Sequence, residues 1–199
     1  MNVPLSWLKT YVKYPEDLAV ADFAEAMIMS GSEVEGYEEM GQDIENVVTG
    51  RVVEMKRHED SDHLWVCMID VGKENLLQIV TGAQNVTVGA MVPVAMDGAV
   101  LPGGKTIKSG ALRGVKSEGM LCSGEELNVD AEQFPESAVY GIWILKEDTP
   151  IGLDIRTVIG CDEVIVEFKT LANRPDCMCM AGIAICARPC STNFRRHLS

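Results

Sequence analysis

Basic side chains gather between residues 103 and 118, where the only acidic residue is Glu118. Positive side chains at this density can bind the phosphates of a nucleic acid without reading its sequence. A serine in the same segment can donate a hydrogen bond to a phosphate or a base edge. The candidate nucleic-acid-binding residues are therefore Lys105, Lys108, Arg113, Lys116 and Ser117. The alternative interpretation is a solvated loop with ordinary surface charge.

Histidines and cysteines suggest a second chemistry, the binding of zinc. His58, His63 and Cys67 are closely spaced, and one residue separates Cys177 from Cys179. A structural zinc site commonly takes its four ligands from close cysteine pairs, and the sequence has no CxxC pair. We therefore expect no metal site and no cofactor. The seven cysteines are expected to be reduced thiols, because a chain of this length does not need disulfides.

The charge of the chain is unevenly distributed. The net charge of −13 at first sight argues against a nucleic-acid partner, but its distribution matters more than its sum. Residues 1–46 hold two lysines against ten acids, and residues 124–170 hold three bases against eleven acids. Residues 47–123 hold eight of each, so the middle is chemically unlike its flanks. Three histidines and scattered carboxylates form no acid–base or nucleophile pattern, so no catalytic residues are expected.

The elements that would position these residues begin with two short helices. Leu5, Leu8 and Val12 recur at helical spacing. Asp22 followed by Glu25 resembles a capping box that opens a second helix, which a glycine at position 31 can end. No apolar run approaches the roughly 20 residues of a bilayer span. The N-terminus lacks the order of a secretory signal, so a cytoplasmic protein is expected.

The pattern changes to that of β-strands from residue 47 onward. Trp65 alternates with Cys67 and Ile69, which favours a core position for the indole over stacking on a base. After residue 150 a further strand is expected over 162–169, and Asp176 is expected to cap a helix that Pro189 ends. The predicted strands of a small antiparallel barrel are 47–55, 64–71, 76–82 and 91–96, closed by 141–146.

Four blocks of sequence are VVTGRVVEMKRHEDSDHLWVCMIDVG (47–72), LQIVTGAQNV (77–86), VPVAMDGAVLPGG (92–104) and LRGVKSEGMLCS (112–123). In their order and spacing they resemble a known tRNA-binding domain with the OB-fold, of the EMAP-II-like type. That domain is shared by the phenylalanyl-tRNA synthetase beta subunit and by free-standing tRNA-binding proteins. In the segment 60–64 the family usually has Asn-Ala-Asp-Lys-Leu, so Asp60 and His63 make this loop more negative here.

The flanks resemble the synthetase beta subunit in particular, through NVPLSWLKTYV (2–12), SGSEVEGYE (30–38) and DEVIVEFKTLANRPDC (162–177). The resemblance implies an α+β fold in which a five-stranded OB-fold β-barrel is inserted into a small discontinuous mixed α/β domain. The implied segments are 1–42 and 150–184 for the outer domain, 43–149 for the OB-fold domain and 185–199 for a divergent tail. Because the resemblance ends near residue 184, a truncated or altered reading of a larger gene product is expected.

The function implied is tRNA binding by a module without a catalytic site, since the family's aminoacylation and editing sites lie elsewhere. The implied partners are tRNA and the synthetase alpha subunit, with neither membrane nor DNA. Two alternatives remain open. One is a free-standing OB-fold protein that binds tRNA or unfolded chains, and the other is a subunit-docking module with minor RNA contact.

Overall fold

The computed structural model describes residues 1–13, 18–138 and 140–197, and divides the chain into two compact units. Residues 1–41 and 162–199 form the outer unit, and residues 42–161 form the inner unit. The inner unit extends past residue 149, where we placed the end of the inserted domain. The backbone N–H of Thr49 donates to Leu153 O at 2.8 Å, and Gly152 N–H donates to Thr49 O at 2.9 Å. These bonds tie residues 150–154 to the inner unit.

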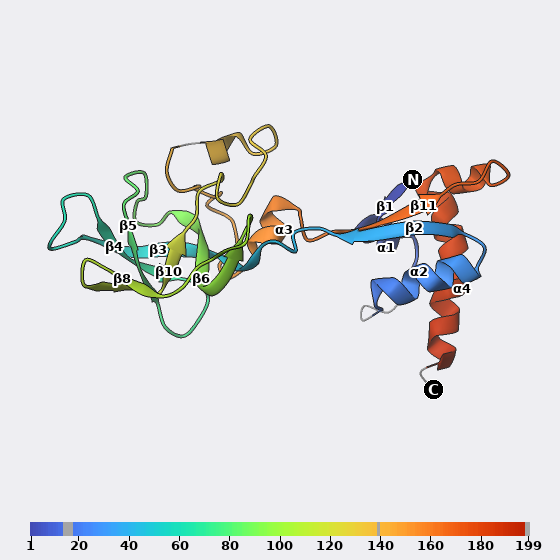
Figure 1. The fold of residues 1–199 in the computed structure, drawn as a ribbon, viewed down its shortest axis with the longest axis horizontal. Helices are drawn as coiled ribbons and strands as arrows, with labels where there is room; N and C mark the ends of the chain where they lie inside the picture. Colours follow the sequence, from blue (N-terminus) through green and yellow to red (C-terminus); the bar gives the residue numbers. More distant parts are fainter. Residues whose placement is uncertain (14–17, 139, 198–199) are drawn as a thin grey trace. The chain divides into compact units, whose positions relative to one another are not determined.

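The outer unit has a three-stranded antiparallel sheet in the order β1–β11–β2. Its strands are β1 (Asn2–Pro4), β2 (Glu33–Glu39) and β11 (Val164–Lys169). The helices are α1 (Leu5–Tyr11), α2 (Val20–Met29), the 3-10 helix η2 (Pro175–Met178) and α4 (Met180–His197) (Figure 1). Their apolar faces enclose one core, which includes Leu8, Phe23, Met27, Phe168 and Ile183.

The structure corrects three predictions about helix ends in the outer unit. The N-cap of α2 is Ala19, not Asp22, because Leu18 and Val20 pack on the core and start the helix earlier. Asp176 lies inside η2 and pairs with a neighbouring arginine instead of capping a longer helix. Pro189 does not end α4, which continues to His197. A proline removes one helical hydrogen bond at a cost of about 3 kcal/mol, which a helix with a packed face can sustain.

The inner unit has a six-stranded antiparallel sheet whose main path is β10–β6–β3–β4–β5. Its strands are β3 (Glu45–Arg57), β4 (Trp65–Asp70), β5 (Leu77–Thr81), β6 (Met91–Leu101), β7 (Lys105–Thr106) and β10 (Gly119–Leu121). A separate hairpin pairs β8 (Gly110–Leu112) with β9 (Val115–Ser117). Short helices η1 (Pro135–Ala138) and α3 (Ile155–Ile159) complete the unit. Alternation along the strands buries one cluster around Ile69 and Val94 and another around Met91 and Trp143.

The expected barrel is not closed within the described residues. Segment 141–146 forms no strand there, and Leu145 makes only an isolated bridge to Met91. The side chain of Asn85 forms hydrogen bonds with both backbone groups of Ile142. It donates to the carbonyl at 2.7 Å and accepts from the N–H at 3.1 Å. These backbone groups are therefore not available to pair with a neighbouring strand. The coarser prediction, a mixed fold with several antiparallel sheets, is confirmed.

Candidate nucleic-acid interface

The β8–β9 hairpin carries two of the predicted binding residues. Leu112 and Val115 face each other across the ladder, which leaves a two-residue turn of Arg113 and Gly114. Both turn residues have positive φ, 48° and 84°. A two-residue turn with φ positive at both positions is the one that matches the twist of a hairpin. The turn holds Arg113 at the tip, where its side chain is exposed.

A buried histidine holds the hairpin against the turn between β3 and β4. Only 4% of His58 is exposed. Its Nδ1 accepts from the backbone N–H of Asp60 at 3.1 Å, so the ring proton belongs on Nε2, which lies 3.2 Å from Leu112 O. His58 therefore joins residues 54 positions apart in the chain. This anchoring role was not predicted, because the sequence marked His58 only as part of an incomplete zinc ligand set.

The structure does not present Ser117 to a ligand, contrary to our expectation. Only 4% of Ser117 is exposed. Its Oγ accepts from Val80 N–H at 3.0 Å and donates to Gly119 O at 2.9 Å. The amide of Gln78 also donates to Lys116 O at 2.7 Å. These bonds attach β9 to β5, so Ser117 positions the hairpin instead of offering a hydroxyl at the surface.

Two arginines from different elements converge on the turn between β3 and β4. Arg113 donates to Asp60 O at 3.0 Å, and Arg57, at the end of β3, donates to Asp62 O. Both bonds go to backbone carbonyls. Neither guanidinium forms an ion pair with a carboxylate in the part of the chain that the structure describes. The guanidinium of Arg57 also lies 4.6 Å from the centre of the Trp65 ring, a cation–π contact.

Two of the three predicted lysines, Lys105 and Lys116, form ion pairs with acids. Lys116 lies 2.7 Å from Glu118 and lowers the pKa of that carboxyl, with a smaller contribution from the Gln78 N–H. We call Arg57, Trp65, Arg113 and Lys116 the hairpin surface. Trp65 is half-buried and packs against the core around Ile69, so it lies only partly in the core position that the sequence predicts.

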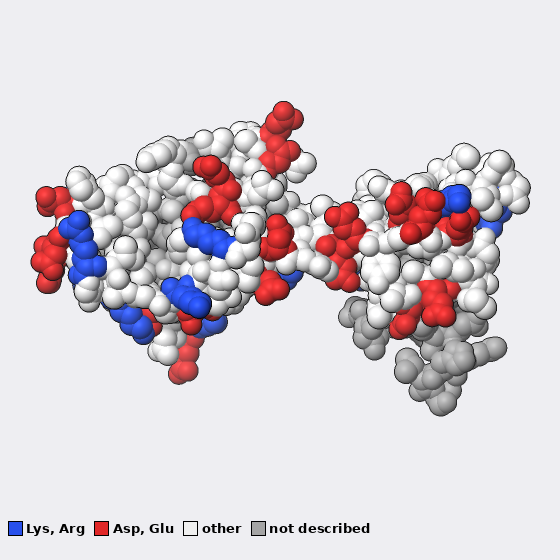
Figure 2. All heavy atoms as spheres, viewed as in Figure 1, with Lys and Arg blue, Asp and Glu red and all other residues white. Residues whose placement is uncertain are grey.

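Lys105 lies in β7, which pairs with the end of β6, and Lys108 follows two residues after β7; we call residues 105–108 the β7 segment. Lys105 lies 3.4 Å from Glu126. Lys108 lies near Asp97, whose pKa is lowered mainly by the Ser109 backbone N–H and slightly by that lysine. The predicted residues are thus divided between the hairpin and β7. On the visible face of the inner unit, basic side chains are interspersed with acidic ones (Figure 2).

A sequence model of a known family matches residues 47–152 and is described as "Putative tRNA binding domain". The chain belongs to this tRNA-binding domain family. The match begins within β3 and continues past β10, so it covers the whole hairpin surface.

Curated relatives extend the similarity over both units. The chain is 46% identical over 184 residues to the phenylalanine–tRNA ligase beta subunit of Clostridium acetobutylicum, covering 92% of this chain and 22% of that protein. The same subunit of Clostridium tetani gives the same identity and coverage, and that of Ralstonia nicotianae is 43% identical over 189 residues. The chain thus spans about a fifth of the length of these relatives. It matches their N-terminal region.

Among solved structures, the C-terminal domain of Plasmodium vivax p43 is 27% identical, with a TM-score of 0.34 over 42% of this chain and 48% of that one. A MetRS-related protein from Pyrococcus horikoshii is 20% identical, with a TM-score of 0.37 over 54% and 85% of the two chains. TM-scores at this level carry no argument about the fold.

Other chemistry suggested by the sequence is not assembled in the tRNA-binding domain. Cys67 is buried, which raises the pKa of its thiol to about 11, whereas His63 is exposed. Among the described residues, neither joins His58 in a group of three possible metal ligands. An open groove between His63, Gln84 and residues 123–126 contains Glu125 and Glu126, whose charges repel phosphate. No helix in the described ranges is long and apolar enough to cross a membrane.

Proposed function

We propose that this chain binds tRNA through the hairpin surface, as the N-terminal tRNA-binding module of a phenylalanine–tRNA ligase beta subunit. The observation that carries the proposal is the convergence of Arg57 and Arg113 on one turn, where both donate to carbonyl oxygens and not to carboxylates. Their positive charge is therefore available to a phosphate. Guanidinium groups bind phosphate oxygens through charge-assisted hydrogen bonds, which are stronger than neutral ones.

Phosphate binding is favoured over base stacking at this surface. The Arg57 guanidinium already covers one face of Trp65, so a base would have to displace it. The Lys116–Glu118 pair is exposed, and such pairs contribute only about 0–1 kcal/mol. Lys116 can therefore exchange its carboxylate for a phosphate at little cost. Contacts of this kind supply affinity without sequence information, and the net charge of −13 keeps that affinity low.

The wider assignments rest on the relatives and on the family resemblance. We propose that the chain contributes binding and no catalysis to a cytoplasmic ligase, and that the whole subunit assembles with an alpha subunit. We further propose that β3 to β6 and β10 correspond to the OB-fold barrel inserted into the outer domain. A docking role with minor RNA contact is the second candidate, favoured by Trp7 and Tyr11 of α1, which are 64% and 55% exposed.

Salt titration of tRNA binding tests the proposal with three variants that each remove two positive charges. Arg113→Asn with Lys116→Gln changes the hairpin, and asparagine tolerates the positive φ of the turn. Lys105→Gln with Lys108→Gln changes the β7 segment. Lys9→Gln with Lys13→Gln changes the outer unit and is the matched control.

The slope of log affinity against log salt becomes shallower by about 0.7–0.9 for each phosphate that the protein no longer neutralises. We expect the hairpin variant to bind more weakly and its slope to flatten by about 1.4–1.8. The outer-unit control should match wild type. An equal decrease in affinity in the hairpin and outer-unit variants would mean that Arg113 and Lys116 are ordinary surface charge, and would favour the docking role.

A further inference from the structure

Three potential metal ligands converge in the outer unit, on elements that do not contribute to the hairpin surface. Asp176 and Cys177 lie in η2, and Cys186 lies two turns into α4. The two sulfurs are 3.7 Å apart, and Cys177 Sγ lies 3.5 Å from Asp176 Oδ2. One ligand atom from each residue lies within 4.8 Å of the other two. This is the one such group among the described residues.

These separations match the edges of a tetrahedral zinc site. With Zn–S bonds of about 2.3 Å and a Zn–O bond of about 2.0 Å, tetrahedral angles place two sulfurs about 3.8 Å apart and a sulfur and an oxygen about 3.5 Å apart. The observed 3.7 and 3.5 Å match these values for two of the three edges. The third edge, between Cys186 and Asp176, lies within 4.8 Å.

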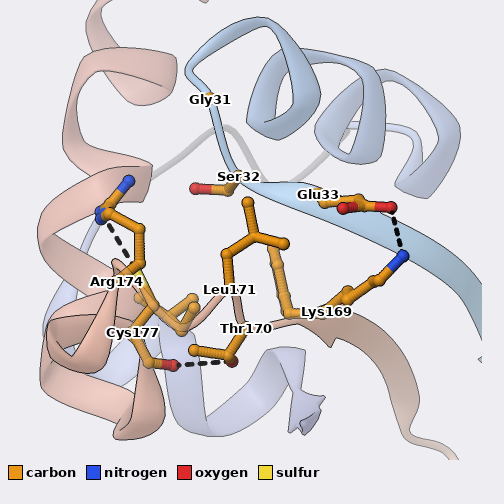
Figure 3. A pocket seen from close by; sticks show the side chains of 10 residues that line it. Gly31, Ser32, Glu33, Lys169, Thr170, Leu171, Arg174 and Cys177 are labelled. Atoms are coloured by element: carbon orange, nitrogen blue, oxygen red, sulfur yellow. Dashed lines mark hydrogen bonds and ion pairs between the residues drawn. The ribbon is translucent and has the colours of Figure 1, made fainter.

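A positive group already occupies the point where the three ligands meet. Nη2 of Arg174 lies 2.8 Å from Asp176 Oδ2, 3.0 Å from Cys177 Sγ and 2.9 Å from Cys186 Sγ. The site is thus arranged around a cation. The Arg174 side chain is 33% exposed, so it can turn outward into solvent. It borders a small cavity of about 20 Å³ that Cys177 also lines (Figure 3), which is room for one water-sized ligand.

We propose that Asp176, Cys177 and Cys186 bind a thiophilic divalent cation such as zinc. The metal binds among the three donors, closer to them than Arg174 Nη2 lies, the guanidinium moves out, and the two thiols release their protons to solvent. A water from the neighbouring cavity supplies the fourth ligand. Ser32 lines that cavity, and its Oγ is buried without a hydrogen-bond partner in the described part of the chain, so it can accept a bond from such a water. The sequence did not indicate this site, because the eight residues between the two cysteines form no recognised zinc-ligand spacing.

The test is a zinc titration of the reduced, metal-free chain in competition with a chromophoric chelator. We expect one equivalent to bind. Cobalt added in place of zinc should give thiolate charge-transfer absorption and the intense visible bands of a tetrahedral ion. Cys186→Ser should weaken binding by more than the 10–100-fold typical of losing an outer-shell partner. Cys177→Ser is the second ligand variant, and Cys161→Ser, a half-buried cysteine of the inner unit, is the matched control.

Arg174→Ala separates a metal site from an ordinary packing cluster. Because the guanidinium competes with the metal for all three ligands, its removal should tighten zinc binding by roughly tenfold. Weaker binding in that variant would contradict the proposal. So would the absence of stoichiometric zinc in the wild-type titration, wild-type affinity in both serine variants, or formation of a Cys177–Cys186 disulfide without metal uptake.

Discussion

Replacing His58 with alanine should release the hairpin while the sheet stays folded. The change removes the donor to Leu112 O and the acceptor of the Asp60 N–H. Detachment of the hairpin breaks only the bond to Leu112 O, because His58 and Asp60 belong to the same turn. A polar group left without its partner costs about 1–3 kcal/mol, and we use the lower value because solvent can reach the Leu112 carbonyl. Leu112 is 45% exposed. This loss of about 1 kcal/mol raises the population of the detached hairpin about fivefold, since about 1.4 kcal/mol is a factor of ten.

Amide hydrogen exchange measures this detachment directly. Exchange across residues 110–117 should be about fivefold faster in His58→Ala, whereas the β3–β6 ladder keeps its wild-type rates. The Asp60 N–H should also exchange faster, because it loses its acceptor. His63→Ala is the matched control, because His63 is exposed in the same turn. Wild-type exchange of the hairpin in His58→Ala, or equal acceleration in both variants, would refute the anchoring role.

Three further substitutions test the packing of the two units. Gly119→Ala places a Cβ in steric conflict with Ala95 O. It should lower the free energy of unfolding of the inner unit by about 1–3 kcal/mol, measured by urea denaturation. Gly110→Ala in the same unit is the control, because a Cβ there meets no close atom. Arg156 lowers the pKa of Asp154 in the folded state below its usual 3.8. The ionised carboxylate therefore stabilises the fold above pH 3.8, and this stability is lost as the pH falls through the lowered pKa. Asp154→Asn should make unfolding less sensitive to acid. Ile183→Ala should destabilise the outer unit by about 2–5 kcal/mol in thermal or urea unfolding, and a decrease no larger than that of the exposed Ile185→Ala would contradict the proposed core.

Several strands of the inner unit were predictable because one of their faces is buried, whereas β1 and β2 of the outer unit were not predicted. Cys67 and Ile69 alternate with more exposed neighbours, and that period locates β4 directly. Segment 141–146 has the same apolar character but is not a strand, because the Asn85 side chain occupies the backbone of Ile142. A side chain 57 positions away from its partner leaves no local signal in the sequence.

The candidate site was also predictable only in part, because some of its residues are brought together by contacts between distant segments. Counting charges identified Arg113 and Lys116, because basic residues are dense in that segment. It did not identify Arg57, which reaches the same turn from β3, or His58, which holds the hairpin in place. The sequence analysis also assigned a nucleic-acid contact to Ser117, whose hydroxyl instead forms internal hydrogen bonds with Val80 and Gly119.

Hydrogen exchange of the chain with and without tRNA tests the central claim most directly. At tRNA concentrations that saturate binding, protection should appear at residues 57–65 and 110–117, where the hairpin surface lies. It should weaken as salt is raised, because phosphate contacts dominate. Protection confined to α1 and α2, or none at saturation, would contradict the assignment of tRNA binding to the hairpin surface.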